Sequence, residues 1–465
     1  MPNRVAARDQ INPMATASTL DTAPHDTIFA LSSGPGRTAL AVVRVSGPAA
    51  GAALDRIAAP RPKPRFAAFR KLRHPDTSEE FDHALVLWFP GPGSETGEDL
   101  CELHVHGGRA VLAATFEALT AVPGCRPATA GEFARRAFDN GKLDLTAAEG
   151  IVDLIDAETD AQRRQALRQA SGALAEIYED WRRELIEAQA LVEAAIDFSD
   201  EADISHSAET NGLAVAASLA LRIKSHLNDG RRGEIVREGF RMVLAGPPNV
   251  GKSSLMNALA RRDVAIVSDE PGTTRDVLEV RLDLGGYMAI VADTAGLREA
   301  LGAIEREGIR RALSRVEDAD LVLWIVDATA PASEVPANLG GRRAPPILRV
   351  LNKIDATAGR ANAASYDHAI SALTGAGLPE LVAKLGGLVR KAAGAGETPA
   401  ITQLRHRQHI EACVKALSKI HLSDMDIELA AEQLRLAADA LGRIVGRIDP
   451  EDVLDQVFAR FCIGK

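Results

Sequence analysis

The chain has 465 residues, of which 46% are hydrophobic and 25% are charged. A chain of this length is expected to form about three domains, and its composition excludes a fibrous or wholly disordered protein. Its formal net charge of -10 gives no overall attraction to phosphate backbones. Contact with a nucleic acid therefore requires a local basic patch or a partner protein.

The sequence also predicts that the protein does not span a membrane. No apolar run reaches the roughly 18 residues that a membrane-spanning helix needs, and the densest runs, at 84–90 and 321–326, have the length of strands. The four cysteines form no C-x-x-C pair, which fits neither a disulfide framework nor a zinc site. Residues 1–24 lack the charge and apolar order of a signal peptide and are expected to be a disordered leader. These features predict a cytoplasmic protein.

Residues 25–143 are predicted to form an α+β domain. Short apolar runs alternate there with glycine and proline, around one helical stretch at 109–119. From 144 to 238 the apolar residues recur every three or four positions. This spacing predicts one long helix or a pair of helices over 146–198, followed by another helix at 213–227.

Residues 239–395 show strands alternating with helices, the order of a doubly wound α/β domain. The predicted strands lie at 241–245, 277–284, 287–292, 321–327, 347–351 and 369–370, the second and third of them forming a hairpin. Helical spacing returns in 396–465, where Asp449 and Pro450 are expected to start a last helix. Neither flanking helical part has an apolar partner of its own, so we expect the α/β domain to be inserted into one helical domain.

GPPNVGKSS, at Gly246–Ser254, fits the phosphate-loop pattern G-x-x-x-x-G-K-[ST] and lies between a predicted strand and a predicted helix. Its glycines let backbone amides surround a phosphate. We expect Lys252 to reach the outer phosphates and Ser253 to offer its hydroxyl to Mg²⁺. The alternative is a glycine-rich turn with a solvated lysine.

NKID, at Asn352–Asp355, predicts the choice of base. One carboxylate can accept hydrogen bonds from both the N1-H and the exocyclic amine of guanine, a donor pair that adenine lacks, so Asp355 indicates GTP. In isolation this aspartate could equally cap a loop. SAL, at Ser371–Leu373, follows another strand and can present a backbone amide to the base.

Two further motifs lie between these in the expected order for a GTPase. DTAG, at Asp293–Gly296, places a carboxylate near Mg²⁺, and GTTRD, at Gly272–Asp276, can bring Thr274 onto the same ion. Leu297 stands where many small GTPases have the glutamine that orients water, so hydrolysis needs another group.

Together with FCIGK at Phe461–Lys465, LWFPGPGSETGEDL, KLDLTAAE, GTTRDV and DTAGLRE, these motifs make the chain resemble the tRNA uridine-modifying GTPases of the MnmE (TrmE) family. The resemblance runs from about Thr27 to Lys465. It implies a folate-binding N-terminal domain that also dimerises, an α-helical domain, and an inserted Ras-like P-loop GTPase domain. The implied domain bounds are 1–24 (leader), 25–143, 144–238, 239–395 and 396–465.

The resemblance also implies a function. Such proteins form homodimers and act with an FAD-containing partner, MnmG, which alone carries the FAD. They add an aminomethyl or carboxymethylaminomethyl group to carbon 5 of the wobble uridine of certain tRNAs. A tetrahydrofolate derivative, 5-formyl or 5,10-methylene, is the implied source of the one-carbon unit.

A potassium ion beside the phosphates is implied as the replacement for an arginine finger. Its implied ligands are Asn249, Ser268, Glu270 and Thr273. Glu305 matches the glutamate that orients the attacking water, with Glu299 and Glu307 as rivals. Arg275 and Arg298 can contact phosphate or only pair with acids. The implied GTP contacts are Asn249, Val250, Gly251, Lys252, Ser253, Ser254, Ser268, Thr273, Thr274, Asp293, Thr294, Ala295, Gly296, Asn352, Lys353, Asp355, Ser371, Ala372 and Leu373.

The implied folate contacts are Arg44, Glu102, Lys142 and Lys465. We expect Arg44 and Lys142 to suit the glutamate tail and Glu102 to accept from the pterin N-H groups. The catalytic candidates are Glu305, Lys252 and Cys462. Cys462 is either a nucleophile or a small buried hydrophobic residue.

His104 and His106 alternate along one predicted strand, where they could suggest a metal. No third ligand has a metal-like spacing, which favours core or pterin-facing histidines.

Two alternatives to this function remain open at the level of sequence. One is a ribosome-assembly or RNA-binding GTPase switch without modification activity, which would be marked by an appended basic RNA-binding module. The other is a scaffold that binds nucleotide without hydrolysing it. Unchanged turnover after Glu305→Ala would favour the second alternative or move the catalytic role elsewhere.

Overall fold

The computed structural model describes residues 26–464 with several gaps. Outside the described residues lie 1–25, 35, 199–201, 230, 263, 267–278, 294–317, 331–344, 358–364, 395–398, 421–424, 449–453, 455–456, 460, 462–463 and 465. The chain divides into two compact units, Met1–Leu143 with Phe458–Lys465, and Asp144–Val457. Each unit is described separately below.

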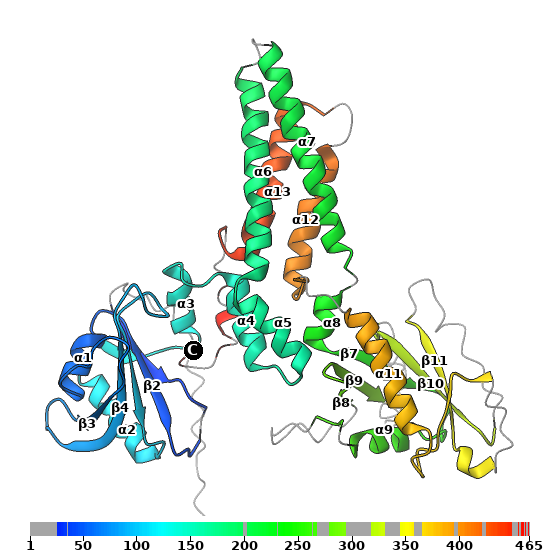
Figure 1. Cartoon of the computed structure of the whole chain (residues 1–465), viewed down its shortest axis with the longest axis horizontal. Helices are drawn as coiled ribbons and strands as arrows, with labels where there is room; N and C mark the ends of the chain where they lie inside the picture. Colours follow the sequence, from blue (N-terminus) through cyan, green and yellow to red (C-terminus); the bar gives the residue numbers. More distant parts are fainter. Residues whose placement is uncertain are drawn as a thin grey trace, which may run out of the picture. The chain divides into compact units, whose positions relative to one another are not determined.

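The first unit is built on a six-stranded sheet in the order β3-β4-β5-β2-β1-β6. Its neighbouring strands are antiparallel except β1 and β6, which run parallel. The strands are β1 (Thr27–Leu31), β2 (Ala41–Ser46), β3 (Ala68–Arg73), β4 (Glu80–Phe89), β5 (Leu100–Val105) and β6 (Cys125–Pro127). The helices are α1 (Ala50–Ile57), α2 (Arg109–Thr120) and α3 (Glu132–Asp139), all visible in Figure 1.

The alternation of apolar residues along these strands explains the core of this unit. Val43 and Val45 of β2 and Leu103 of β5 are buried in the same cluster as Leu54 of α1. Side chains two positions apart share one face of a strand, so this spacing buries one face of the sheet under helices. The predicted α+β class and the helix at 109–119 are confirmed.

The last described residues of the chain also pack in the first unit. The rings of Phe458 and Phe138 lie edge to face with centroids 6.3 Å apart. Ser32 Oγ donates a hydrogen bond of 2.8 Å to the Gly464 carbonyl. From the sequence, these residues are expected to belong to the second part of the helical domain.

The second unit begins with helices. They are α4 (Leu145–Ile155), α5 (Asp160–Ala170), α6 (Ala173–Asp197), α7 (Ala202–Leu227) and α8 (Arg232–Glu238), and α12 (Leu404–Ile420) and α13 (Ile427–Val445) follow much later in the chain. The prediction of one helix or a pair over 146–198 was wrong, because three helices occupy it. Thr159 and Gln162 form a capping box that starts α5, and Gly172, with φ 87°, starts α6 from the left-handed region.

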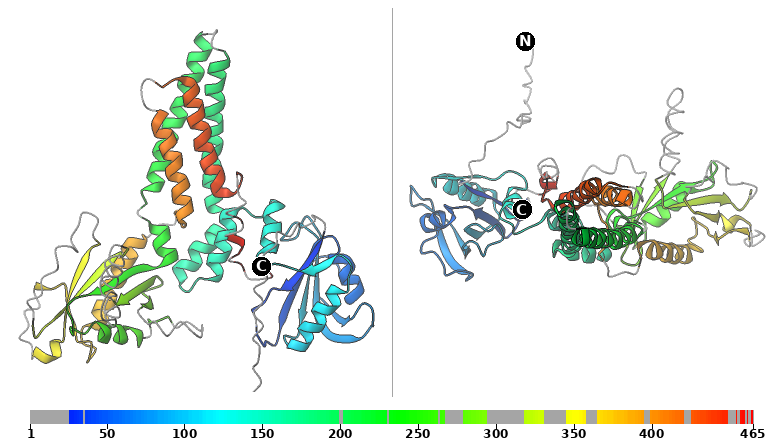
Figure 2. Two further views of the ribbon diagram at one scale, coloured as in Figure 1. Left: turned by 180° about the vertical axis from the view of Figure 1, so that it is seen from behind. Right: turned by 90° about the horizontal axis from the view of Figure 1, so that it is seen from above.

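Helices α6, α7, α12 and α13 lie side by side as a bundle (Figures 1 and 2). Leu185 and Val192 of α6, Leu219 of α7 and Leu434 and Leu441 of α13 are buried in one cluster. Helices from both flanks of the α/β part therefore cover one another's apolar faces. This confirms the inserted architecture expected from the sequence.

The α/β part contains a six-stranded sheet in the order β12-β11-β10-β7-β9-β8, parallel except for the β8–β9 hairpin. Its strands are β7 (Phe240–Ala245), β8 (Glu279–Asp283), β9 (Met288–Asp293), β10 (Leu321–Asp327), β11 (Ile347–Asn352) and β12 (His368–Ala369). Helices α9 (Lys252–Ala260) and α11 (Leu378–Ala393) and the 3₁₀ helix Ile354–Thr357 complete the described part. The predicted hairpin and doubly wound order are confirmed.

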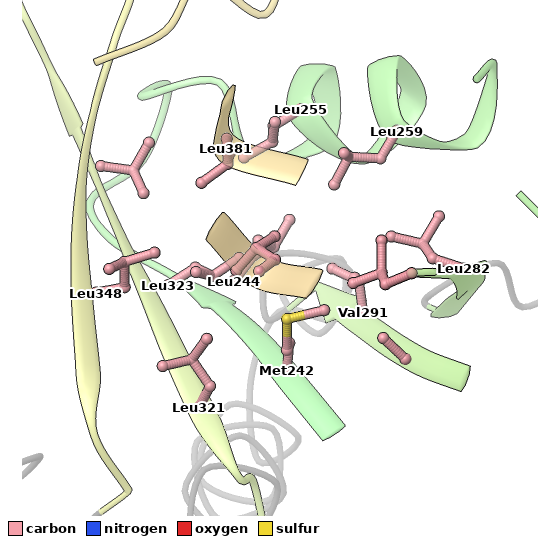
Figure 3. Close-up of a cluster of buried hydrophobic side chains, with 14 of the residues drawn as sticks. Met242, Leu244, Leu255, Leu259, Leu282, Val291, Leu321, Leu323, Leu348 and Leu381 are labelled. Atoms are coloured by element: carbon pink, nitrogen blue, oxygen red, sulfur yellow. The ribbon is translucent and has the colours of Figure 1, made fainter. Parts of the chain in front are cut away.

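The core of this sheet is drawn in Figure 3. Leu255 and Leu259 of α9 and Leu381 of α11 pack on Leu244 of β7 and Leu323 of β10. These strands carry continuous apolar runs because helices cover them. The core fixes β7, β9, β10 and β11, whose carboxyl ends carry the polar residues described next. Among the helices within the described residues, none is long and apolar enough to cross a bilayer.

Candidate functional site

The turn between β7 and α9 depends on two glycines. Gly246 has φ 145°, and a Cβ there would lie 2.3 Å from the Ile325 carbonyl oxygen. Gly251 has φ 94°, and its Cβ would lie 2.4 Å from Nδ2 of Asn352. Backbone of this shape admits only glycine, which lets the loop pass close to the neighbouring strands.

Lys252 is the first residue of α9 and is only 8% exposed. Its Nζ donates to the carbonyl oxygens of Gly246 and Pro247, at 2.9 and 2.8 Å. The ammonium group is thus held inside the loop by the loop's own backbone. A positive charge at the start of a helix, beside the backbone N-H groups of its first turn, makes this turn suited to a phosphate.

Ser253 and Asp293 bring two oxygen ligands together. Ser253 Oγ donates to Oδ2 of Asp293 at 3.0 Å, and Asp293, at the end of β9, is 5% exposed. A hydroxyl and a carboxylate beside a phosphate loop are suitable donors for Mg²⁺, directly or through water. These two residues therefore fit the ion that the sequence implies.

Asn352 links the phosphate loop to the loop after β12. Its amide group is almost fully buried, with Nδ2 donating to the Val250 carbonyl at 2.9 Å and Oδ1 accepting from the Ala372 amide at 3.0 Å. The side chain thus holds three segments that are far apart in sequence. The Ala372 amide, expected to contact the base, is engaged by Asn352.

Asp355 lies beside this link and is exposed. Its Oδ1 accepts a hydrogen bond of 2.5 Å from Oγ of buried Ser371. Leu373, also predicted to contact the nucleotide, is 86% exposed. An accessible carboxylate, oriented by one hydroxyl, is the arrangement expected for recognition of guanine N-H groups.

Asp327 is a residue of this site that the sequence analysis missed. Lys353 Nζ donates to Asp327 Oδ2 at 2.6 Å and to the Asn249 carbonyl at 2.7 Å. Burial would raise the pKa of the Asp327 carboxyl, but its hydrogen bonds to Lys353 and Thr329 outweigh this and hold that pKa below its usual range. The available signal was the position of Asp327 at the carboxyl end of an apolar strand beside the phosphate loop.

The described residues therefore bring together one part of the predicted nucleotide site. Asn249, Val250, Gly251, Lys252, Ser253, Ser254, Asp293, Asn352, Lys353, Asp355, Ser371, Ala372 and Leu373 all lie on the turn and strand ends above. The other predicted residues lie outside the described residues: Ser268, Glu270, Thr273, Thr274, Arg275, Thr294, Ala295, Gly296, Arg298, Glu299, Glu305, Glu307, Asp449, Pro450, Cys462 and Lys465.

The predicted folate residues of the first unit form a second polar group. Arg44 and Glu102 are cross-strand partners on β2 and β5, with Nη2 3.1 Å from Oε1. Arg44 Nη1 also lies 2.9 Å from Glu95, and Glu102 lies 3.3 Å from Nε2 of His104. Arg44 Nε is buried without a hydrogen-bond partner among the described residues.

These contacts fit a ligand that offers polar N-H groups. They do not fit the expected role of Arg44 as a partner of the glutamate tail. Arg44 already faces two carboxylates, so a glutamate tail would have to displace one of them. Lys142 is exposed, and no carboxylate of the described residues pairs with it. Lys142 is therefore the better partner for an anionic tail, while Glu102 can accept from a pterin ring.

The two histidines do not lie together in this group. His106 is exposed and contacts Asp82, with Nδ1 2.7 Å from Oδ1, whereas His104 contacts Glu102. Within the described residues, no three His, Cys, Asp or Glu side chains are placed to hold a metal.

A mostly parallel sheet with this turn and these strand ends defines a Ras-like P-loop GTPase domain, inserted here in a helical domain. Two sequence models of known families match the chain: the MnmE helical domain over residues 145–462, a range that spans the α/β part, and the GTP-binding protein TrmE N-terminus over residues 27–142. The chain belongs to the MnmE (TrmE) family.

Curated relatives agree with this assignment. The tRNA modification GTPase MnmE of Methylorubrum populi is 52% identical, covering 95% of this chain and 98% of that protein. The protein of the same name from Parvibaculum lavamentivorans is also 52% identical and is covered completely, over 95% of this chain. Among solved structures, the G domain of the T. maritima FeoB iron transporter is 27% identical, covers 33% of this chain and 99% of that chain, and gives a TM-score of 0.25.

Proposed function

We propose that this protein hydrolyses GTP and uses the reaction in tRNA modification. The observation that carries the proposal is the position of Asn352, which joins the phosphate loop at Val250 to the loop of Ser371 and Ala372 beside Asp355. The proposed phosphate contacts and the proposed base contacts are thereby linked through the hydrogen bonds of one buried side chain. The proposal that tRNA is the substrate is supported by the relatives, which are named tRNA modification GTPases.

The finer proposal is that the protein forms a homodimer and acts with the FAD-containing MnmG in the cytoplasm. Together they place an aminomethyl or carboxymethylaminomethyl group on carbon 5 of the wobble uridine. The chain's own contribution is to hold a tetrahydrofolate derivative near Glu102 and Lys142. That derivative supplies the one-carbon unit when bound.

For hydrolysis, Lys252 would neutralise the outer phosphates, and Ser253 with Asp293 would hold Mg²⁺. The Asn249 side chain is exposed on the same turn, where a potassium ion could add a second positive charge. Glu305 remains the proposed group that orients water. Leu297 cannot serve in that role because its side chain has no polar atom.

The test is steady-state GTP hydrolysis in potassium and in sodium buffer of equal ionic strength. We expect potassium to stimulate turnover and Asn249→Ala to abolish the stimulation. Asn257→Ala, an exposed asparagine on α9, is the matched control and should retain it. Equal rates in both salts would contradict the potassium mechanism. No GTP turnover in potassium and none in sodium would contradict the proposal that the protein hydrolyses GTP.

Modification is tested separately. The purified chain, MnmG, a tetrahydrofolate derivative and an unmodified tRNA are incubated with GTP, and the mass of the wobble nucleoside is measured. We expect a mass increase that requires both proteins. An unchanged uridine would favour a GTPase switch without modification activity.

A further inference from the structure

A cavity of about 770 Å³ lies within the unit Asp144–Val457, lined by α5 to α8 and by residues near the end of α11. Four arginines line it: Arg164 and Arg168 of α5, Arg222 of α7 and Arg232 of α8. None of them belongs to the nucleotide or folate residues described above. Four arginine side chains thus line one cavity in a chain whose net charge is -10.

The pairing of these arginines leaves positive charge at the cavity. Arg164 pairs with Asp160, and both Nη atoms of Arg222 pair with Glu184. No carboxylate of the described residues pairs with Arg168 or Arg232, both of which are exposed. These two guanidinium groups are thus available to an anion.

The one carboxylate among the described lining residues does not cancel this charge. Asp229 Oδ1 accepts from the Arg231 amide at 3.2 Å and lies 3.8 Å from Nη2 of Arg407. Arg407, which does not line the cavity, also pairs with Glu234, with Nε 2.7 Å from Oε1, so its positive charge is shared between Glu234 and Asp229. Neither Arg168 nor Arg232 pairs with Asp229 among the described residues.

The cavity also has aromatic walls. Trp181 of α6 lines it but is only 7% exposed, because its ring packs edge to face against His226 at a centroid distance of 5.2 Å; Tyr287 of the β8–β9 hairpin lines it as well and is half-buried. A volume of 770 Å³ falls in the range of about 300 to 1,000 Å³ that encloses small molecules. Aromatic faces beside guanidinium groups are the usual means of holding an unstacked base next to its phosphates.

We propose that this cavity binds the tRNA backbone, with one unstacked nucleotide inside and its flanking phosphates at Arg168 and Arg232. The inference rests on the proposed function in tRNA modification. RNA is the favoured source of phosphate because arginines on three separate helices line the cavity together with the half-buried ring of Tyr287. The bound nucleotide is an anchor rather than the reacting uridine, whose chemistry is assigned to the folate residues.

The test is binding of an unmodified tRNA transcript to the full chain across a salt series. Arg168→Ala and Arg232→Ala should each weaken binding about fivefold to tenfold and reduce the slope of log affinity against log salt by about 0.7 to 0.9. Arg168→Lys should restore most of the slope because it keeps the charge. Arg163→Ala is the matched control, since Arg163 is exposed on α5 but does not line the cavity.

Three outcomes of the tRNA binding measurement would overturn the inference. They are unchanged affinity and slope in both alanine variants, an equal loss in Arg163→Ala, and absence of tRNA binding by the unaltered chain. Binding of uridine monophosphate is measured separately. If Arg168→Ala abolishes tight binding of this nucleotide but leaves tRNA affinity unchanged, the cavity is a site for a free nucleotide. GTP turnover of the unaltered chain is measured in the same preparation, so failure of the cavity is distinguished from failure of the proposed function.

Discussion

Replacing Asp355 by asparagine removes the charged acceptor proposed to recognise guanine while preserving the size of the side chain. Asp355 is exposed, and in the free chain its described partner is the Ser371 hydroxyl at 2.5 Å. A hydrogen bond to a charged group contributes about 1.5 to 3 kcal/mol, which corresponds to about a 10- to 150-fold change in affinity. We therefore expect Asp355→Asn to weaken GTP binding by this factor.

The same substitution should improve the relative binding of xanthosine triphosphate, whose C2 oxygen accepts from the new amide. Titration calorimetry with both nucleotides measures the two affinities. Ser371→Ala keeps the carboxylate but removes its orienting hydroxyl, so its effect on GTP should be smaller. Asp180→Asn, an exposed aspartate on α6, is the matched control. Unchanged GTP affinity in Asp355→Asn would refute the assignment of the base-recognition site.

Two further predictions concern the loop and the helical part. Gly251→Ala places a Cβ 2.4 Å from Nδ2 of Asn352 at a positive φ, so this substitution should abolish measurable GTP binding and lower Tm. The control is Gly387→Ala, at an exposed glycine of α11 where an added Cβ would have no atom within 4 Å. It should leave GTP binding unchanged and stabilise the protein by about 0.5 to 1 kcal/mol. Glu149 is buried against Arg405 and His406; burial alone would raise its pKa, but these partners lower it from 4.5 to about 2. Because the folded pKa lies below the unfolded one, this stabilisation is present above about pH 4.5 and is lost as the pH falls toward 2. Glu149→Gln should lower the free energy of unfolding by about 3 kcal/mol at neutral pH, as measured by urea denaturation. In the variant this free energy should also fall less steeply as the pH is lowered. An equally steep fall in the variant and in the unaltered chain would contradict the lowered pKa of Glu149.

Most residues of the proposed nucleotide site can be recognised in the sequence. Gly246, Gly251 and Lys252 act within one short turn, whose conformation follows from glycine's freedom at positive φ. Asp355 also lies a few residues after a predicted strand, and Ser371 directly follows another. In a parallel sheet the carboxyl ends of such strands meet at one edge, so the order of the motifs predicted their proximity.

Other parts of the site depended on contacts between distant segments. The carboxylate of Asp327 became a site residue only because β10 lies beside β7 and β11, which brings it to Lys353 and the Asn249 carbonyl. Arg44 illustrates the same limit: its sequence motif predicted a ligand for an anion, while the register of β2 and β5 places it against Glu102. Charge alone does not show which partner a side chain takes.

The sequence by itself determined the local chemistry of this protein: the phosphate loop, the aspartate proposed to recognise guanine, and the alternation of strands and helices. It did so because these features depend on backbone conformation and periodicity within a few residues. Only the tertiary structure decided that 146–198 divides into three helices and that arginines of α5, α7 and α8 surround one cavity. The spacing of apolar residues is nearly the same in a continuous helix and in a broken one, and the packing of distant helices alone brings their charges together.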